Sequence, residues 1–177
     1  MTDVAIIYGG VKAESRLNVL TDYAIDHLES TQQSYSVIPV FELPSEDLIT
    51  ANSKRAEIAN ALKTVQEARA VIVLTPVFKS AYSGVLKTFL DLLPMKSLEN
   101  KVVLPIMIGG SFGHLLAIDY SLKPVLTALG ASWIQKGSYV LDAHVAEGRI
   151  IEQQAEARMH TELEHFINAM IVQQQTS

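Results

Sequence analysis

The sequence contains no cysteine among its 177 residues. Disulfide bonds, thiolate nucleophiles and iron–sulfur ligation are therefore excluded. Long apolar runs are also absent, since stretches such as 71–74 and 102–108 fall far short of the roughly 20 residues that cross a bilayer. No basic segment precedes the apolar run near the N-terminus, so we expect no signal peptide and a cytoplasmic protein.

Positive charge is sparse as well. Lys and Arg total 14 against 19 Asp and Glu, and no basic cluster stands out. We therefore expect neither nucleic acid nor a membrane as a partner. The five histidines include one pair in a helical pattern, His160 and His165, whose spacing places them on different faces of a helix. This spacing predicts no metal site.

What the chain does contain is an ordinary globular composition, with 49% hydrophobic and 19% charged residues, which favours a single domain over residues 1–177. Short apolar runs alternate with helical patterns. This alternation predicts an α/β fold: a doubly wound, five-stranded parallel sheet in the order 2-1-3-4-5, with helices on both faces. The expected strands are 4–8, 34–40, 70–75, 101–108 and 132–141, and the expected helices are 16–29, 53–68, 84–93, 114–129 and 153–172.

Ligands of such sheets bind at the carboxyl ends of the strands, and three of these ends have unusual sequences. The first is "GGVKAESRLN" (9–18), where Gly10 belongs to a pair of glycines that allows a tight turn. Free N–H groups, the helix dipole and two cations at a helix start predict a phosphate site formed by Lys12, Ser15, Arg16 and Asn18. Neither GxGxxG nor GxxxxGK[ST] is present, and an ordinary turn with surface cations is an equal alternative.

The second unusual loop lies in "TPVFKSAYSGVLKTFLDLLP" (75–94). Pro76 fixes the direction of the chain as it leaves the sheet, and Phe78 and Tyr82 offer flat surfaces. Ser83 can cap a helix that starts near Gly84. The loop suits a planar, partly polar ring, although a hydrophobic loop that packs on its neighbours would look similar.

The third loop, "GGSFGH" (109–114), begins with Gly109 and Gly110, which let the backbone approach a ligand closely. Ser111 and His114 are its polar side chains, and a lone histidine at a helix start is more often a capping or surface residue. A phosphate on the first loop and a flat ring between the other two describe a mononucleotide, and a flavin fits best. A phospho-receiver domain is excluded because "VLTP" ends the third strand without an acidic residue.

These segments resemble the NADPH-dependent FMN reductases of the flavodoxin-like superfamily. The resemblance rests on "TPVFKSAYSGVLKTFLDLLP", on "KVVLPIMIGGSFGHLLAIDYSLKPVL" and, more weakly, on "GGVKAESR". It is strongest to reductases that supply reduced flavin to alkanesulfonate monooxygenase. It implies a flavodoxin-like fold, FMN, hydride transfer from NADPH or NADH, and a flavin-dependent monooxygenase as partner. The candidate FMN-binding residues are Gly10, Lys12, Ser15, Arg16, Asn18, Pro76, Val77, Phe78, Lys79, Tyr82, Ser83, Gly84, Gly109, Gly110, Ser111 and His114.

The sequence departs from the family pattern in its first loop. Residues 9–12 read Gly-Gly-Val-Lys where the family usually has Gly-Ser-Pro-Arg, and Leu17 stands where a serine is common. Phe78 also replaces a tyrosine. A lysine cannot make the bidentate phosphate contact of an arginine, so these changes suit an enzyme that releases its flavin. The alternatives are a reductase of quinones, azo dyes or metal oxyanions that retains FMN, and a flavodoxin-type electron carrier, which the mild acidic excess disfavours.

The expected helix 114–129 is apolar almost all round, which predicts a homo-oligomer, either a dimer or, as we favour, a tetramer. A helix buried within one subunit is the alternative. Pro124 lies inside its pattern and deprives the carbonyl of Tyr120 of a hydrogen-bond donor. A π-bulge accommodates this defect, and a plain kink is the alternative. The resemblance implies that Tyr120 lies in a π-helix at a subunit interface beside the flavin, where it would control flavin exchange and assembly.

Overall fold

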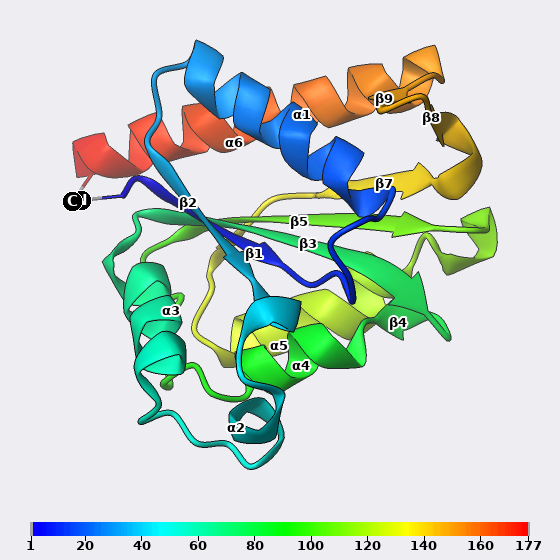
Figure 1. Ribbon diagram of the computed structural model, residues 1–177. Helices are drawn as coiled ribbons and strands as arrows, with labels where there is room; N and C mark the ends of the chain where they lie inside the picture. Colours follow the sequence, from blue (N-terminus) through cyan, green and yellow to red (C-terminus); the bar gives the residue numbers. More distant parts are fainter. Residues whose placement is uncertain (1, 177) are drawn as a thin grey trace.

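The structure is a computed structural model that describes residues 2–176, and its centre is a parallel sheet (Figure 1). The strand order β2-β1-β3-β5-β6 confirms the predicted order 2-1-3-4-5. β7 also pairs with β5, in parallel and next to β6. The strands are β1 (Val4–Tyr8), β2 (Tyr35–Pro39), β3 (Ala70–Phe78), β5 (Val102–Gly109), β6 (Trp133–Ile134) and β7 (Ser138–Leu141).

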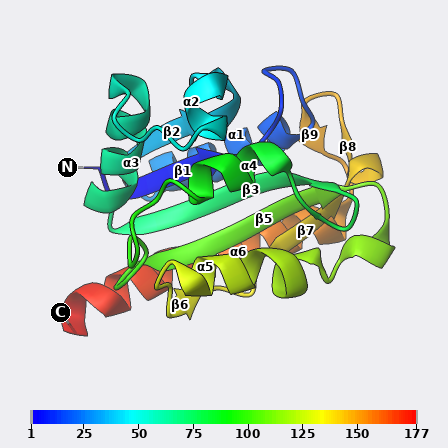
Figure 2. The ribbon, with the colours of Figure 1, turned by 90° about the horizontal axis from the view of Figure 1, so that it is seen from below.

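Helices cover both faces of this sheet. α1 (Leu17–Ser30) and α6 (Gln153–Thr176) lie on one face, and α3 (Ala56–Glu67), α4 (Gly84–Leu90) and α5 (Lys123–Ala128) lie on the other (Figures 1 and 2). Alternate residues of β3 enter the two cores, with Val71 and Val73 on the α3 side and Ile72 and Leu74 on the α1 side. Because both faces are covered, the strands read as continuous apolar runs. None of the helices described could cross a membrane.

Several short elements were not expected from the sequence. They include α2 (Ser45–Ile49), β4 (Ala81–Tyr82), which pairs with the end of β3, and a hairpin of β8 (Val145–Ala146) and β9 (Arg149–Ile150). Three 3₁₀ turns complete the set: η1 (Val40–Glu42), η2 (Phe112–His114) and η4 (Asp142–His144). Each is too short to give a periodic hydrophobic signal.

The predicted last strand, 132–141, is divided into β6 and β7. β5 residues 103 and 106 pair with residues 134 and 138, so the last strand carries one extra residue opposite Pro105. Pro105 has no N–H to donate there. Gly137, at φ +89°, lies so close that a Cβ on it would be 2.6 Å from the Pro105 carbonyl oxygen. Its own N–H donates to Glu162 Oε2 at 3.2 Å. The proline thus produces a bulge.

The predicted continuous helix 114–129 is also divided. It consists of η2, a π-helix, η3 (Ile118–Leu122), and then α5. The Lys123 N–H donates to the Ile118 carbonyl five residues back, which confirms the widened turn expected around Tyr120. The cause is Pro124, which cannot continue the regular ladder.

Gly137 should tolerate alanine much less well than Gly148, another glycine with positive φ. Both require the left-handed region, but a Cβ at Gly148 would meet nothing within 4 Å. We expect Gly148→Ala to lower the free energy of unfolding by about 1 kcal/mol and Gly137→Ala by about 3 kcal/mol or more, measured by urea denaturation. Equal losses would show that the contact with Pro105 imposes no constraint.

Candidate flavin site

A cavity of 510 Å³ lies at the carboxyl edge of the sheet. It brings together candidate residues from all three loops that the sequence singled out: Lys12, Ser15, Arg16, Pro76, Val77, Phe78 and Gly109. Its remaining lining residues are Val11, Glu14, Ile108 and Asp142. The volume lies within the range of small-molecule sites, about 300–1,000 Å³.

The end of the cavity formed by the loop after β1 is suited to an anion. No backbone N–H from Gly10 to Arg16 has a hydrogen-bond acceptor within residues 2–176. Neither Lys12 nor Arg16 forms an ion pair with the described residues. Ser15 sits at the start of α1, where its Oγ accepts a hydrogen bond from the Leu17 N–H at 3.2 Å. Free donors and unpaired cations at a helix N-terminus favour a phosphate.

Asn18 shapes this loop from behind and does not line the cavity. Its Oδ1 accepts a hydrogen bond from the Tyr8 hydroxyl at 2.6 Å, and its Nδ2 donates to the Ala13 carbonyl at 2.5 Å. These two bonds tie the Asn18 side chain to its own loop, and a direct contact of Asn18 with the phosphate remains a prediction. Burial raises the pKa of Tyr8, which keeps its hydroxyl protonated as the donor. Gly10 is needed for space, because a Cβ there would lie 2.3 Å from the Tyr8 ring.

The second loop is a tight hairpin of β3 and β4. Val77 pairs with Tyr82, and the turn residues Lys79 and Ser80 have φ values of +50° and +66°. Two consecutive non-glycine residues with positive φ form a strained turn, and such strain is concentrated at functional sites. The hairpin holds Phe78 with 49% of its surface exposed. Phe78 therefore offers an apolar surface at the rim of the cavity.

Ser83 links this hairpin to the first loop. Its hydroxyl donates to the Gly9 carbonyl at 2.5 Å and accepts from the Leu86 N–H at 3.0 Å, so it caps α4 as predicted. Its own N–H donates to the Thr75 hydroxyl at 3.0 Å. Ser83 is fully buried, and a direct contact with a flavin remains a prediction.

The third loop approaches the cavity through Gly109. A Cβ on Gly109 would lie 2.4 Å from the Tyr139 hydroxyl, and that hydroxyl donates to the Ser111 carbonyl at 2.7 Å. The N–H groups of Gly110 and Ser111 have no acceptor within the described chain. The loop therefore presents two free backbone donors near the cavity.

Asp142 is a cavity residue that the sequence patterns did not indicate. It follows β7 directly and lines the cavity opposite the first loop. Its position after a parallel strand was the signal that could have found it, because the carboxyl ends of parallel strands meet at one edge. A carboxylate repels phosphate, so we expect this end of the cavity to face the uncharged part of a ligand.

The remaining candidates do not line the cavity. Tyr82 is held in the hairpin, Gly84 begins α4 and His114 ends η2. Lys79 is at the exposed tip of the hairpin. Direct contacts of these residues with a flavin remain predictions.

Comparisons with known proteins agree with this geometry. A sequence model described as NADPH-dependent FMN reductase matches residues 2–146. The chain belongs to this family. It is similar to the FMN reductase (NADPH) of Pseudomonas putida, with 40% identity over 92% of this chain and 85% of that protein. The FMN reductase (NADPH) of Escherichia coli is 38% identical over 94% of this chain and 89% of its own length.

A solved structure confirms the fold assignment. An NADH:FMN oxidoreductase in its apo form superimposes with a TM-score of 0.86 and 29% identity, covering 94% of this chain and 88% of that chain. The fold is flavodoxin-like, as predicted. The FMN reductase family uses FMN with NADPH or NADH, so this protein is a flavin-dependent oxidoreductase.

The cavity fits the flavin that the family implies. The unpaired Lys12 and Arg16 and the free N–H groups of the first loop suit the phosphate. Pro76, Val77 and Phe78 offer the apolar surface that a flat ring needs. Glu14, the acidic residue that the first loop contributes to the cavity lining, is exposed to solvent, where water screens its charge.

Arg16→Ala should weaken FMN binding about tenfold or more, because a charge-assisted hydrogen bond contributes about 1.5–3 kcal/mol. Arg149→Ala is the matched control, since it removes the same charge from β9, outside the cavity lining. Fluorescence titration measures both dissociation constants. An unchanged constant for Arg16→Ala, or an equal loss in both variants, would contradict the phosphate assignment.

Proposed function

We propose that the protein transfers a hydride from NADPH, or NADH, to FMN and then releases the reduced flavin to a partner monooxygenase. The observation that carries this proposal is the charge arrangement of the cavity. Unpaired cations, free N–H groups and the exposed ring of Phe78 meet at one cavity, in a chain of the FMN reductase family. This arrangement matches a phosphate joined to a flat ring.

The roles of the residues follow from their chemistry. The flavin and the nicotinamide supply the hydride chemistry when bound. Lys12 and Arg16 neutralise phosphate charge, and the Ser83 hydrogen bonds keep the first and second loops at a fixed separation. The free N–H groups of Gly110 and Ser111 are suited to stabilise negative charge on a reduced ligand. Positioning of two rings against each other is the main contribution expected of the protein.

Release of the flavin is favoured by the weakness of its phosphate contacts. Lys12 is a point charge without the fork geometry of arginine. Asn18, whose side chain bonds to Tyr8 and Ala13, does not line the cavity. The P. putida and E. coli relatives are named for FMN itself as the compound reduced, which supports FMN as a substrate. The proposal that the partner is a monooxygenase of sulfonate sulfur assimilation is based on the sequence resemblance.

A second candidate is a reductase that retains FMN and passes electrons to an azo dye or quinone. A relative named NADPH azoreductase, from Bacillus, is 28% identical over 84% of this chain and 82% of its own length. The two candidates differ in whether the flavin leaves the protein. The experiment therefore tests whether FMN stays bound to the protein.

Purification without added flavin should yield colourless protein that oxidises NADPH only when free FMN is supplied, with turnover saturating in FMN. The control is the same assay with an azo dye or a quinone and no FMN, which should show no turnover. A yellow protein that keeps stoichiometric FMN through gel filtration and reduces either acceptor unaided would favour the second candidate.

We further propose that the protein is a homo-oligomer, a dimer or tetramer, assembled through the region around η3. Leu115, Leu116 and Tyr120 are exposed together there, and Tyr120 is 79% exposed. Three large apolar side chains in six residues would lose contact with water in a subunit interface. The π-helix holds Tyr120 outward on a widened turn, and its ring is suited to close over a flavin of the neighbouring subunit.

Tyr120→Ala should weaken assembly and change flavin retention and the KM for FMN. Tyr120→Phe removes only the hydroxyl and should therefore distinguish the contribution of the hydroxyl from that of the ring. Light scattering at micromolar concentration gives the mass, and visible absorbance with steady-state turnover gives flavin content and kinetics. The assignment fails if Tyr120→Ala purifies colourless, keeps its mass and turns over free FMN as before. A monomeric mass of the unaltered protein would reject the oligomer itself.

A further inference from the structure

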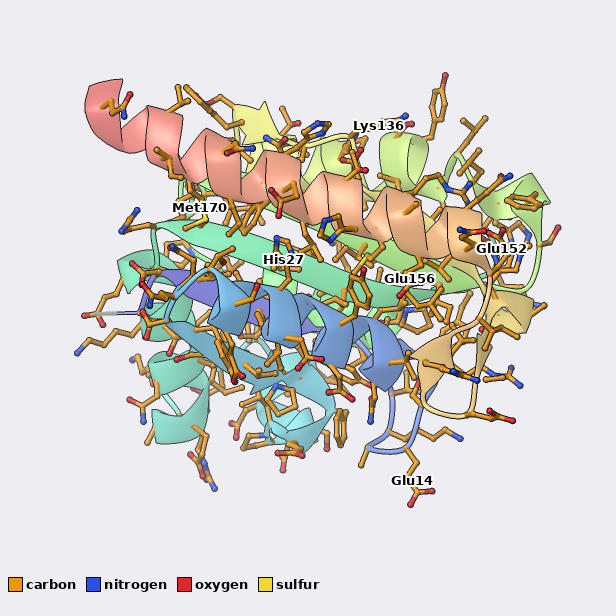
Figure 3. The ribbon with its side chains drawn as sticks, turned by 90° about the horizontal axis from the view of Figure 1, so that it is seen from above. Glu14, His27, Lys136, Glu152, Glu156 and Met170 are labelled. Carbon is orange, nitrogen blue, oxygen red and sulfur yellow. The ribbon has the colours of Figure 1, made fainter. Side chains whose placement is uncertain are left out.

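A cluster of three possible metal ligands lies between α1 and α6, away from the flavin cavity. His27 is near the end of α1, and His160 and Glu164 are four residues apart on α6 and so share one face of that helix. One ligand atom from each residue lies within 4.8 Å of the other two. Figure 3 shows His27 between the two helices. The contact joins segments more than a hundred residues apart in sequence.

His27 is the anchored member of the cluster. Its side chain is only 8% exposed, and its Nε2 is buried without a hydrogen-bond partner in the described chain. Glu164 Oε1 lies 3.1 Å from this nitrogen without forming a hydrogen bond. Buried polar atoms in folded proteins are nearly always satisfied, so this one needs an explanation.

The other two ligands are exposed and adjustable. The His160 ring meets His27 edge to face, with 5.2 Å between ring centroids and an angle of 84° between planes. A tetrahedral ion with bonds of about 2.0–2.1 Å places its ligand atoms about 3.4 Å apart. The 3.1 Å separation of His27 from Glu164 is already near this value. Rotation of the exposed His160 side chain can shorten the longer separations.

We propose that His27, His160 and Glu164 bind one divalent transition-metal ion, with zinc the ion that two imidazoles and a carboxylate suit best. Imidazole nitrogen is a poor ligand for magnesium and calcium, which prefer oxygen. Water completes the fourth position. The buried His27 nitrogen, which forms no hydrogen bond within the described chain, gains a ligand bond.

The ion fastens α6 to α1 and takes no part in hydride transfer. His27 and Arg16 lie at opposite ends of α1, so at 1.5 Å per residue the ion would be about 16 Å from the flavin cavity. α6 packs against the sheet through Met159, Leu163 and Phe166, all fully buried. Cross-linking this helix to α1 therefore stabilises one whole face of the sheet.

The first test uses tag-free protein stripped with a chelator and titrated with Co²⁺ and then Zn²⁺. We expect one ion per chain, a visible Co²⁺ spectrum of tetrahedral intensity, and its loss when Zn²⁺ displaces the cobalt. Zinc at about a hundred times its dissociation constant should raise the melting temperature by about 5–10 °C. No saturable binding, or no thermal shift at saturation, would overturn the proposal.

Variants assign the ion to the cluster. His160→Ala and Glu164→Gln change exposed side chains, so both should fold, and each should weaken zinc binding at least tenfold. His165→Ala is the matched control, because it removes an exposed histidine from the same helix but outside the cluster. FMN turnover should be the same in all three. Equal weakening by His165→Ala, or unchanged binding in His160→Ala, would reject the site.

Discussion

The parallel pairing of β1, β3 and β5 is the constraint on which the rest of the structure depends. Parallel strands place all their carboxyl ends at one edge, and covered faces bury every residue of their apolar runs. Loops that follow these strands must therefore meet at that edge. Lys12, Ser15 and Arg16 meet Pro76 to Phe78 and Gly109 for this reason, although up to a hundred residues separate them in sequence.

The loops at this edge are held by a few buried polar contacts. Ser83 connects Gly9, Thr75 and the first turn of α4 through three hydrogen bonds. Asn18 fixes the loop after β1 from its inner side through Tyr8 and Ala13. These contacts leave the N–H groups and the cations of the loop directed away from the protein's own acceptors. The site suits an anion because the internal hydrogen bonds leave these N–H groups and cations without partners in the described chain.

Two prolines interrupt regular structure for the same physical reason, the missing N–H. Pro105 in β5 lies beside the extra residue that divides the last strand. Gly137, which has no Cβ, allows the two backbones to approach closely there. Pro124 leaves the helix around it with a bond from Lys123 to Ile118, which widens the turn at Tyr120. The first interruption affects packing, whereas the second holds an aromatic side chain out of the protein.

The sequence by itself determined the alternating strands and helices and the three loops of the cavity, because continuous apolar runs and glycine-rich ends are local signals. It also indicated the π-turn, since a proline inside a helical pattern has few local solutions. Only the tertiary structure decided that Asn18 bonds inward and that Asp142 lines the cavity, because side-chain partners depend on neighbours distant in sequence. The cluster of His27 with His160 also depends on the fold, because the two residues are distant in sequence. Sequence spacing drew attention only to His160 and His165, which lie on different faces of one helix and therefore predicted no metal site.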